Sequence, residues 1–316
     1  MAQGVRGLMK RLGARGGDAV AAVVPAPPAC ARLSPTPAEA AFLFDINDLR
    51  RRPRHENEAM IRRLCDNAYL GDATALCRIL GRYKLFVDTL DIGLSTHLLL
   101  DGYWETWVTE AMLDVVRPGM VALDIGANLG YYTLLLADLV GPGGRVHAFE
   151  PNPAIMTRLQ RSVAVNGFGD RVALHAAPLG AEDGTEVALV IPEGEPKNAH
   201  IVSPERASGR GITLHATTLD AVIGGQRVDF IKIDAEGAER AIWQGMRGLL
   251  ARGEALTIFL EFAASRYADA AGFLADIRAA GFALAAIDPV AGVAPIEAPA
   301  ILARPGDEDW MLVLTR

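Results

Sequence analysis

The amino-acid sequence predicts an α/β fold built on a doubly wound parallel sheet, and two observations lead to this class. From Met120 onward, short apolar runs alternate with longer stretches at helical spacing, the pattern of parallel strands joined by crossover helices. The last two apolar runs, 282–287 and 310–315, have no helical pattern between them. Since parallel neighbours need a crossover, we predict that this last pair is antiparallel.

The chain before this region divides into two predicted parts. Residues 1–55 are rich in Ala, Pro and Arg and lack sustained periodicity, so we predict a largely disordered tail. Residues 56–117 are predicted to form a small helical lead-in or cap. Within it, the apolar positions of 57–83 follow helical spacing, with a break at Gly71-Asp72. A short strand at 85–90 and a helix at 104–115 complete this part.

The predicted α/β domain occupies residues 118–316. Apolar runs between Gly or Pro clusters define its strands, and i, i+3, i+4 spacing defines its helices. The expected strands are 120–124, 145–150, 172–175, 187–191, 212–217, 228–234, 255–261, 282–287 and 310–315. The expected helices are 131–140, 154–166, 239–250 and 267–280. The Pro-rich segments 192–211 and 288–309 are predicted to be loops.

The net charge and its distribution along the chain limit the partners that the protein can bind. A net charge of −7 argues against a general nucleic-acid binder, because the phosphate backbone requires a cationic surface. The charge is uneven, since residues 1–63 carry net +5 and the rest −12. The arginine run at 50–54 is interpreted as solvated charge, and a basic arm for an anionic surface is the less favoured alternative.

No targeting or membrane segment is expected. The apolar run Ala19–Val24 is shorter than the roughly 7–15 residues of a signal-peptide core. No stretch approaches the roughly 20 apolar residues of a transmembrane helix. Cys30, Cys65 and Cys77 lack metal-ligand spacing and are interpreted as free thiols. The sequence therefore predicts a soluble, cytoplasmic protein, and its oligomeric state cannot be read from these features.

The most informative segment is V-A-L-D-I-G-A-N-L-G-Y-Y-T at 121–133. It predicts a buried strand that ends at Asp124, a turn through Gly126 and Gly130, and a helix. A dinucleotide fingerprint beginning at Gly126 would need glycines at the positions of Asn128 and Tyr131. An acid in the turn disfavours a pyrophosphate. It favours a cationic or zwitterionic ligand, such as the amino-acid end of S-adenosylmethionine.

Three further acidic positions follow later strands. Glu150, at the end of the second strand, is suited to accept both ribose hydroxyls of a nucleoside; its alternative is a helix-capping acid before Pro153. The segment at 229–237 carries Lys232, Asp234 and Glu236 to the same edge. Its alternative is an ion pair that only shapes the loop. Glu261 ends the fifth strand and is either part of this rim or a turn acid.

These motifs carry a family resemblance. The segments D-I-G-A-N-L-G-Y-Y-T (124–133), F-E-P-N-P (149–153) and D-F-I-K-I-D-A-E-G-A-E (229–239) resemble those of the FkbM family of class I S-adenosylmethionine-dependent methyltransferases. The resemblance implies a Rossmann-like sheet in the order 3-2-1-4-5-7-6 with an antiparallel last strand. It also implies methyl transfer to a hydroxyl of a sugar, a polysaccharide or a secondary metabolite. The net charge adds the expectation of no nucleic-acid partner.

The resemblance also assigns residues to roles. It places Lys232, Asp234 and Glu236, the predicted catalytic residues, near the transferred methyl group. From their shared position at the strand end, we expect that Asp234 or Glu236 takes the hydroxyl proton and that Lys232 orients the acceptor or tunes the acid. The assigned cofactor-binding residues are Glu105, Asp124, Gly126, Ala127, Asn128, Gly130, Glu150, Pro151, Asn152 and Asp234. A divalent metal on Asp234, Glu236 and Glu261 is a less favoured aid, and no metal site is predicted. The histidines are interpreted as structural, with His200 the one that could border the acceptor.

Two other functions compete with methyl transfer. One is an NAD-dependent or nucleotide-sugar oxidoreductase, which the glycine spacing disfavours. The other is a non-catalytic protein that keeps the cofactor fold, which the intact Lys232-Ile233-Asp234-Ala235-Glu236 segment disfavours. Specificity for the acceptor is expected in the lead-in and in the two loops 192–211 and 288–309, none of which identifies a substrate.

Overall fold

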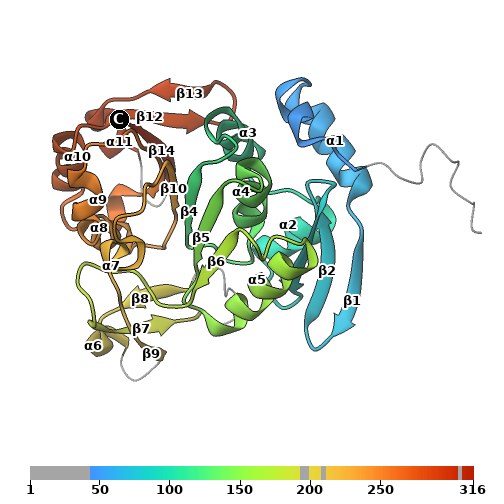
Figure 1. Ribbon diagram of the computed structural model, residues 1–316, viewed down its shortest axis with the longest axis horizontal. Coiled ribbons are helices and arrows are strands. Elements are labelled where there is room, and N and C mark those ends of the chain that lie inside the picture. The colour runs from blue at the N-terminus through green and yellow to red at the C-terminus, as the bar shows by residue number, and fades with distance from the viewer. Residues whose placement is uncertain (1–42, 193–198, 208–210, 305–307) are drawn as a thin grey trace, which may run out of the picture. The chain divides into compact units, whose positions relative to one another are not determined.

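A central sheet of eight strands carries the fold (Figure 1) in this computed structural model, which describes residues 43–192, 199–207, 211–304 and 308–316. The strand order is β13-β12-β14-β11-β10-β4-β5-β6. The strands are β4 (Val121–Ile125), β5 (Arg145–Phe149), β6 (Val172–His175), β10 (Phe230–Ile233), β11 (Thr257–Phe262), β12 (Ala283–Asp288), β13 (Gly292–Pro295) and β14 (Trp310–Thr315).

The predicted order 3-2-1-4-5-7-6 is confirmed, with β4, β5, β6, β10, β11, β12 and β14 as its first to seventh strands. The five strands from β6 to β11 are parallel to one another. β14 runs antiparallel to both β11 and β12, as the missing crossover predicts. β13 is an additional strand at the edge beyond β12. The predicted loop 288–309 is corrected accordingly, because it contains β13 and the short helix α11 (Ala298–Leu302).

Helices cover both faces of the sheet, and this explains why the central strands are mostly apolar, with Asp124, His147 and Lys232 as buried exceptions. One hydrophobic cluster contains Leu134 of α4 (Tyr131–Val140) and Leu159 of α5 (Pro153–Val165). The other contains Ile242 of α8 (Glu239–Gln244) and Phe273 of α10 (Ala270–Ala279). Along β10, Phe230 joins the first cluster and Ile231 and Ile233 join the second. Strand alternation therefore directs Lys232 to the face covered by α4.

One predicted helix is interrupted. The stretch 239–250 forms two helices, α8 and α9 (Arg247–Ala251). They are separated at Gly245, where an added Cβ would lie 2.0 Å from the carbonyl oxygen of Gly180. The break therefore lies where the backbone passes close to a neighbouring loop, which only glycine permits.

The lead-in differs from its prediction. Helices α1 (Arg54–Leu64), α2 (Leu94–Leu100) and α3 (Thr106–Val115) are present. However, the predicted helical pattern up to residue 83 is wrong beyond α1. That stretch holds an antiparallel sheet of β1 (Asn67–Gly71), β2 (Thr74–Ile79) and β3 (Tyr83–Asp88). In β2 the side chains of Ala75, Cys77 and Ile79 are buried, a spacing of two that belongs to a strand. Asp72 and Ala73, both at positive φ, form the turn of the hairpin.

The folded part begins earlier than predicted. A 3₁₀ helix, η1 (Ile46–Arg50), follows Phe44, and the side chains of Phe44, Ile46 and Leu49 are buried. The predicted disordered tail up to residue 55 is therefore wrong from residue 43 on. Residues 1–42 lie outside the described residues.

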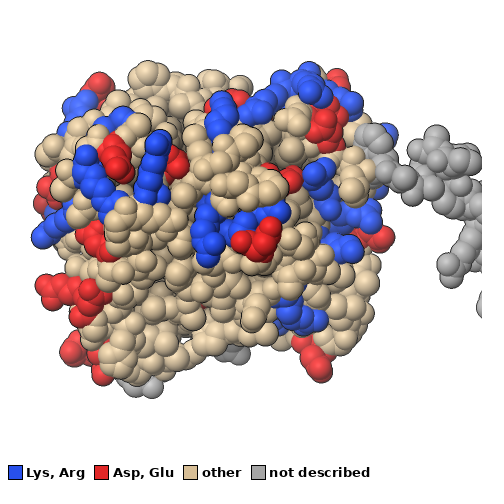
Figure 2. All heavy atoms as spheres, viewed as in Figure 1, with Lys and Arg blue, Asp and Glu red and all other residues tan. Residues whose placement is uncertain are grey.

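The arginine run around η1 faces carboxylates rather than forming a cationic surface. Arg50 lies 3.2 Å from Asp114, and Arg54 lies 2.6 Å from Glu110. On the face drawn in Figure 2, basic and acidic side chains are interspersed. Among the described residues, no helix is long and apolar enough to cross a membrane.

A second small sheet follows β6, with β7 (Glu186–Val190) between β8 (His200–Val202) and β9 (Ile212–His215). β7 and β9 confirm two predicted strands. The predicted loop 192–211 is corrected, because its described part contains β8 and the short helix α6 (Pro204–Ala207). Helix α7 (Leu219–Ile223) and the 3₁₀ helix η3 (Ala264–Arg266) complete the described elements that the site uses.

Candidate active site

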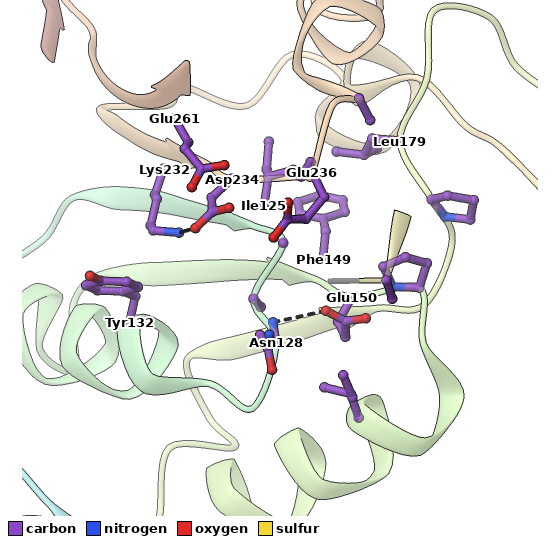
Figure 3. Close-up of a pocket in the computed structure, with 18 of the residues that line it drawn as sticks. Ile125, Asn128, Tyr132, Phe149, Glu150, Leu179, Lys232, Asp234, Glu236 and Glu261 are labelled. Carbon is purple, nitrogen blue, oxygen red and sulfur yellow. Dashed lines mark hydrogen bonds and ion pairs between the residues drawn. The ribbon is translucent and has the colours of Figure 1, made fainter. Parts of the chain in front are cut away.

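The largest set of predicted site residues meets in one pocket at the carboxyl ends of β4, β5, β10 and β11 (Figure 3). Parallel strands end at the same edge, which is where open α/β sheets bind their ligands. In Figure 3, Asn128 and Glu150 lie on one side of the pocket. Lys232, Asp234 and Glu261 lie on the other. The pocket therefore has two chemically distinct walls.

The glycine turn after β4 forms the junction between these walls. The backbone N–H groups of Gly126 and Ala127 both donate to the carbonyl oxygen of Phe149, at 3.0 and 2.9 Å. Gly126 has a φ of +79°, and a Cβ added there would lie 1.8 Å from the carbonyl oxygen of Asp234. The turn can therefore contact both β5 and β10 only with glycine at this position. Gly130, at the other end of the turn, is the N-cap of α4 and does not line the pocket.

Glu150 is held in place by backbone donors. Its Oε2 accepts from the N–H of Asn128 at 3.0 Å, and its Oε1 accepts from the N–H of Asn152 at 2.7 Å. Burial raises the pKa of Glu150 to about 7, although both backbone donors favour the ionised form. Pro151 lines the pocket beside it. Asn152 does not line the pocket; its side chain caps α5 by accepting from the N–H of Ala154. The capping role considered for Glu150 thus belongs to Asn152.

Asp124 lies behind the pocket wall rather than in it. Its side chain is fully buried, and its Oδ2 accepts from the hydroxyl of Thr133 at 2.5 Å. Its Oδ1 has no hydrogen-bond partner among the described residues. Burial raises the pKa of Asp124, while Lys232 on the adjacent strand opposes this rise. An unpartnered carboxylate oxygen beneath the glycine turn fits a cationic group of a ligand, as the ammonium of an amino acid would be.

Lys232 and Asp234 form a buried ion pair at the end of β10. The Nζ of Lys232 lies 2.9 Å from the Oδ2 of Asp234, and the lysine side chain is 2% exposed. Burial alone would lower the pKa of Lys232, but Asp234 and Asp124 outweigh it and raise the pKa. Burial alone would raise the pKa of Asp234, but Lys232 outweighs it and lowers the pKa. Both groups are therefore charged at neutral pH.

A second cluster surrounds Arg266, at the end of η3. Its guanidinium contacts Glu261, lies 3.3 Å from Glu236 and lies 3.2 Å from Asp309. Burial, and then the neighbouring Asp234, raises the pKa of Glu261 to about 9. The same two causes raise the pKa of Glu236. Burial and Asp234 therefore favour the protonated form of Glu261, while its contact with Arg266 favours the ionised form.

The lead-in contributes Glu105, which precedes α3. Its Oε2 accepts from the hydroxyl of Tyr132 at 2.9 Å. The Tyr132 ring lies under the Lys232 ammonium, with 4.7 Å between Nζ and the ring centroid. Burial, and then Asp234, raises the pKa of Glu105. Glu105 thus reaches the pocket.

The structure brings together most, but not all, of the predicted site residues. The predicted residues that line the pocket are Glu105, Gly126, Ala127, Asn128, Glu150, Pro151, Lys232, Asp234 and Glu236. Asp124, Gly130 and Asn152 support it from behind. Sequence reasoning missed Tyr132 and Arg266, whose roles depend on tertiary contacts. The tyrosine pair after Gly130 was a signal that could have identified Tyr132; no comparable signal marked Arg266.

Apolar side chains close the remaining side of the pocket. Leu179 follows β6, and Leu189 and Ile201 come from β7 and β8. The described part of the segment 192–211, which the sequence predicted as a loop, therefore borders the pocket through Ile201. Among the described residues, no group of three His, Cys, Asp or Glu side chains is placed to hold a metal ion.

Comparison with known proteins identifies the family. The model of the methyltransferase FkbM domain matches residues 124–284. The chain is 42% identical over 57 residues to the 31-O-demethyl-FK506 methyltransferase FkbM of Streptomyces tacrolimicus, covering 18% of this chain and 22% of that protein. It is 25% identical over 145 residues to methyltransferase 1 of Beauveria bassiana, covering 39% of this chain and 57% of that protein.

Solved structures include a SAM-dependent O-methyltransferase from Thermotoga maritima, with a TM-score of 0.38 at 13% identity over 76% of this chain and 77% of that one. The chain spans about a fifth of the length of the first curated relatives that it matches. The FkbM domain model, by contrast, spans half of the chain and includes the glycine turn, Glu150 and the Lys232–Asp234 pair. The chain therefore belongs to the FkbM family of methyltransferases, whose cofactor is S-adenosylmethionine.

Proposed function

We propose that this protein transfers a methyl group from S-adenosylmethionine to a hydroxyl of a sugar, a polysaccharide or a secondary metabolite. The observation that carries the proposal is the buried Lys232–Asp234 pair, which opens onto the same pocket as the glycine turn and Glu150. Charged groups held in a pocket with shifted pKa values are typical of catalytic sites. A relative whose name denotes O-methylation supports the choice of oxygen.

The wall with Glu150 fits the cofactor. Glu150 uses one lone pair of each oxygen on a backbone N–H, so each oxygen can still accept a ribose hydroxyl. The unpartnered Oδ1 of Asp124 fits the amino-acid end. When bound, S-adenosylmethionine supplies a methyl group on a positively charged sulfur, which an oxygen nucleophile can accept.

The opposite wall fits the acceptor. A hydroxyl is a poor nucleophile until its proton leaves, and a positioned base typically accelerates such a step by roughly 10²–10⁴-fold. Lys232 lowers the pKa of Asp234, whereas burial raises the pKa of Glu236. Since a base works best with a pKa near the working pH, Glu236 is the better proton acceptor. Lys232 and Asp234 then orient the hydroxyl.

Three substitutions test the proposal: Lys232→Met, Asp234→Asn and Glu236→Gln. Each variant is offered a panel of sugars, glycans and hydroxylated metabolites, and methylated products are measured by mass spectrometry. We expect turnover to fall by roughly 10²–10⁴-fold in Glu236→Gln, while S-adenosylhomocysteine still binds in calorimetry. Full turnover in all three variants, with cofactor binding unchanged, would refute the proposed roles. Binding of NAD in place of S-adenosylhomocysteine would refute the assignment to this cofactor.

A further inference from the structure

Resting on the function proposed above, we propose that Tyr132 is a positioning residue that holds the Lys232 ammonium against Asp234, and that Glu105 fixes Tyr132 from the lead-in. The three contacts form a continuous path. Glu105 accepts from the Tyr132 hydroxyl at 2.9 Å, the Tyr132 ring lies 4.7 Å from Nζ of Lys232, and Nζ lies 2.9 Å from Asp234. Figure 3 shows Lys232 between the ring and the carboxylate.

Lys232 needs more than one partner because it is almost fully buried. The residue is 1% exposed, and a buried ammonium without compensating contacts loses its proton or moves toward water. Asp234 satisfies one of its three N–H directions. The face of the Tyr132 ring attracts the remaining positive charge, an interaction that strengthens where water is excluded.

Glu105 is fixed by the start of α3. It precedes this helix with a φ of 37°, in the left-handed region that non-glycine residues seldom adopt. Such a conformation persists only where surrounding contacts hold it, and it is frequent at functional sites. Donation of the Tyr132 hydroxyl to Glu105 also polarises the phenol and enriches its ring in electron density. The lead-in thus influences the charge of Lys232 without touching it.

The neighbouring tyrosine provides the matched comparison. Tyr131 also contacts α3, since its hydroxyl lies 3.2 Å from that of Thr109. Thr109 is buried and does not line the pocket. Thr109→Val therefore removes one contact between α3 and α4 and leaves the Lys232 environment unchanged.

The first test is a double-mutant cycle in stability between Tyr132 and Lys232. Lys232→Met removes the charge and keeps most of the apolar stem. We expect Tyr132→Leu to lower the folding equilibrium constant, measured by urea denaturation, and this loss to be roughly 30-fold smaller in the Lys232→Met background. Tyr132→Phe keeps the ring and should keep most of the coupling. Thr109→Val should be additive with Lys232→Met. Equal losses in both backgrounds would overturn the proposal.

The second test is the pH profile of turnover with the acceptor that the panel identifies. A weaker hold on Lys232 lets the pKa of Asp234 rise, so the acid limb should move to higher pH in Tyr132→Leu and recover in Tyr132→Phe. An unmoved limb in Tyr132→Leu would overturn the proposal. The ionisable groups that face this pair from the packed elements are Glu105, Asp124, Glu236, Glu261 and Arg266.

The two proposals can fail separately. If no methyl transfer is found, the stability cycle still decides whether Tyr132 holds the Lys232 charge. If methyl transfer is found without coupling, only the role of Tyr132 fails. Should Tyr132→Leu not fold, Tyr132→Met takes its place. Glu105→Leu then adds a second arm: it removes the acceptor of the Tyr132 hydroxyl, so the stability coupling between Tyr132 and Lys232 should fall to the level seen with Tyr132→Phe, and coupling that stays at the wild-type level counts against the role of Glu105.

Discussion

Burial sets the charge state of individual acids around the pocket, and the direction differs from residue to residue. Glu150, Glu236 and Glu261 have raised pKa values because their carboxylates lose water. Burial would raise the pKa of Asp234 as well, yet Lys232 outweighs this effect and lowers it. The ammonium of Lys232 thus keeps Asp234 charged, so that it can orient a substrate, whereas the neighbouring acids are more basic. Such a separation of pKa values is what acid–base chemistry at neutral pH requires.

Glu150 leads to a prediction about cofactor affinity. Since its pKa is about 7, its carboxylate is protonated in part of the neutral range. Only the ionised form can accept a hydrogen bond on both oxygens from a ribose. We expect the affinity for S-adenosylhomocysteine to rise as the pH increases from 6 to 8. In Glu150→Gln the affinity should fall by roughly 10–100-fold, the loss of a hydrogen bond to a charged group.

Calorimetry at pH 6, 7 and 8 measures this dependence. Glu182→Gln, an exposed acid in the loop after β6, serves as the control and should bind as the wild type does. A Glu150→Gln variant with wild-type affinity at pH 8 would contradict the assignment of the ribose to Glu150.

At the scale of elements, the geometry of the site depends on the turn that follows β4, because this turn packs directly against the backbone at the end of β10. Gly126→Ala forces a Cβ to within 1.8 Å of the Asp234 carbonyl oxygen, so the two loops must separate. We expect a stability loss of about 1–3 kcal/mol from overpacking, added to roughly 1 kcal/mol for the left-handed backbone, and a strong loss of S-adenosylhomocysteine binding.

Gly167→Ala separates these two contributions. Gly167 has a similar φ of +73°, but an added Cβ there has no atom within 4 Å. It should show the backbone cost alone, with unchanged cofactor binding. Urea denaturation and calorimetry on both variants give the comparison. Equal stability losses at the two positions would show that the close approach to β10 does not constrain the turn.

Local patterns predicted the elements of the α/β part because each strand and helix there follows one periodicity. Helix α4 and strands β6 and β14 have the predicted bounds. The sequence analysis missed the β1–β2 hairpin because the apolar positions there, such as Leu76 and Ile79, are compatible with a helix and with a strand. Only packing against the rest of the lead-in decides which of the two forms. Similarly, the strand-end acids were predicted from their positions. Tyr132 and Arg266 were not, because their roles depend on contacts with residues far away in sequence, such as Glu105 for Tyr132 and Asp309 for Arg266.

At the scale of the whole molecule, the acids of the site and two histidines on β5 and β6 change the stability of the fold with pH in opposite ways. The folded-state pKa values of Glu150 and Glu261 lie above the ordinary value of 4.5. Their stabilising contribution is therefore present below about pH 4.5 and is lost as the pH rises to about 7 and 9, respectively. These two acids thus make the fold less stable at neutral pH than at acidic pH, and they provide charged groups where a substrate binds.

The last prediction concerns two histidines on β5 and β6, near the edge of the sheet. The Nδ1 of His147 lies 3.0 Å from the Nε2 of His175, and the two rings are stacked. Burial, and then the neighbouring His175, lowers the pKa of His147 to about 4, and burial also lowers the pKa of His175.

The unfolded chain binds protons near pH 6.5, where the folded pair of histidines does not. Stability should therefore fall as the pH drops from about 6.5 to 4, by about 3 kcal/mol for the shift of His147 alone. His147→Gln keeps a hydrogen-bonding group and should remove most of this fall, whereas His55→Gln, on the exposed side of α1, should not. Urea denaturation at pH 7, 5.5 and 4.5 gives the three curves, and a wild-type-like acid loss in His147→Gln would place the sensitive groups elsewhere in the chain.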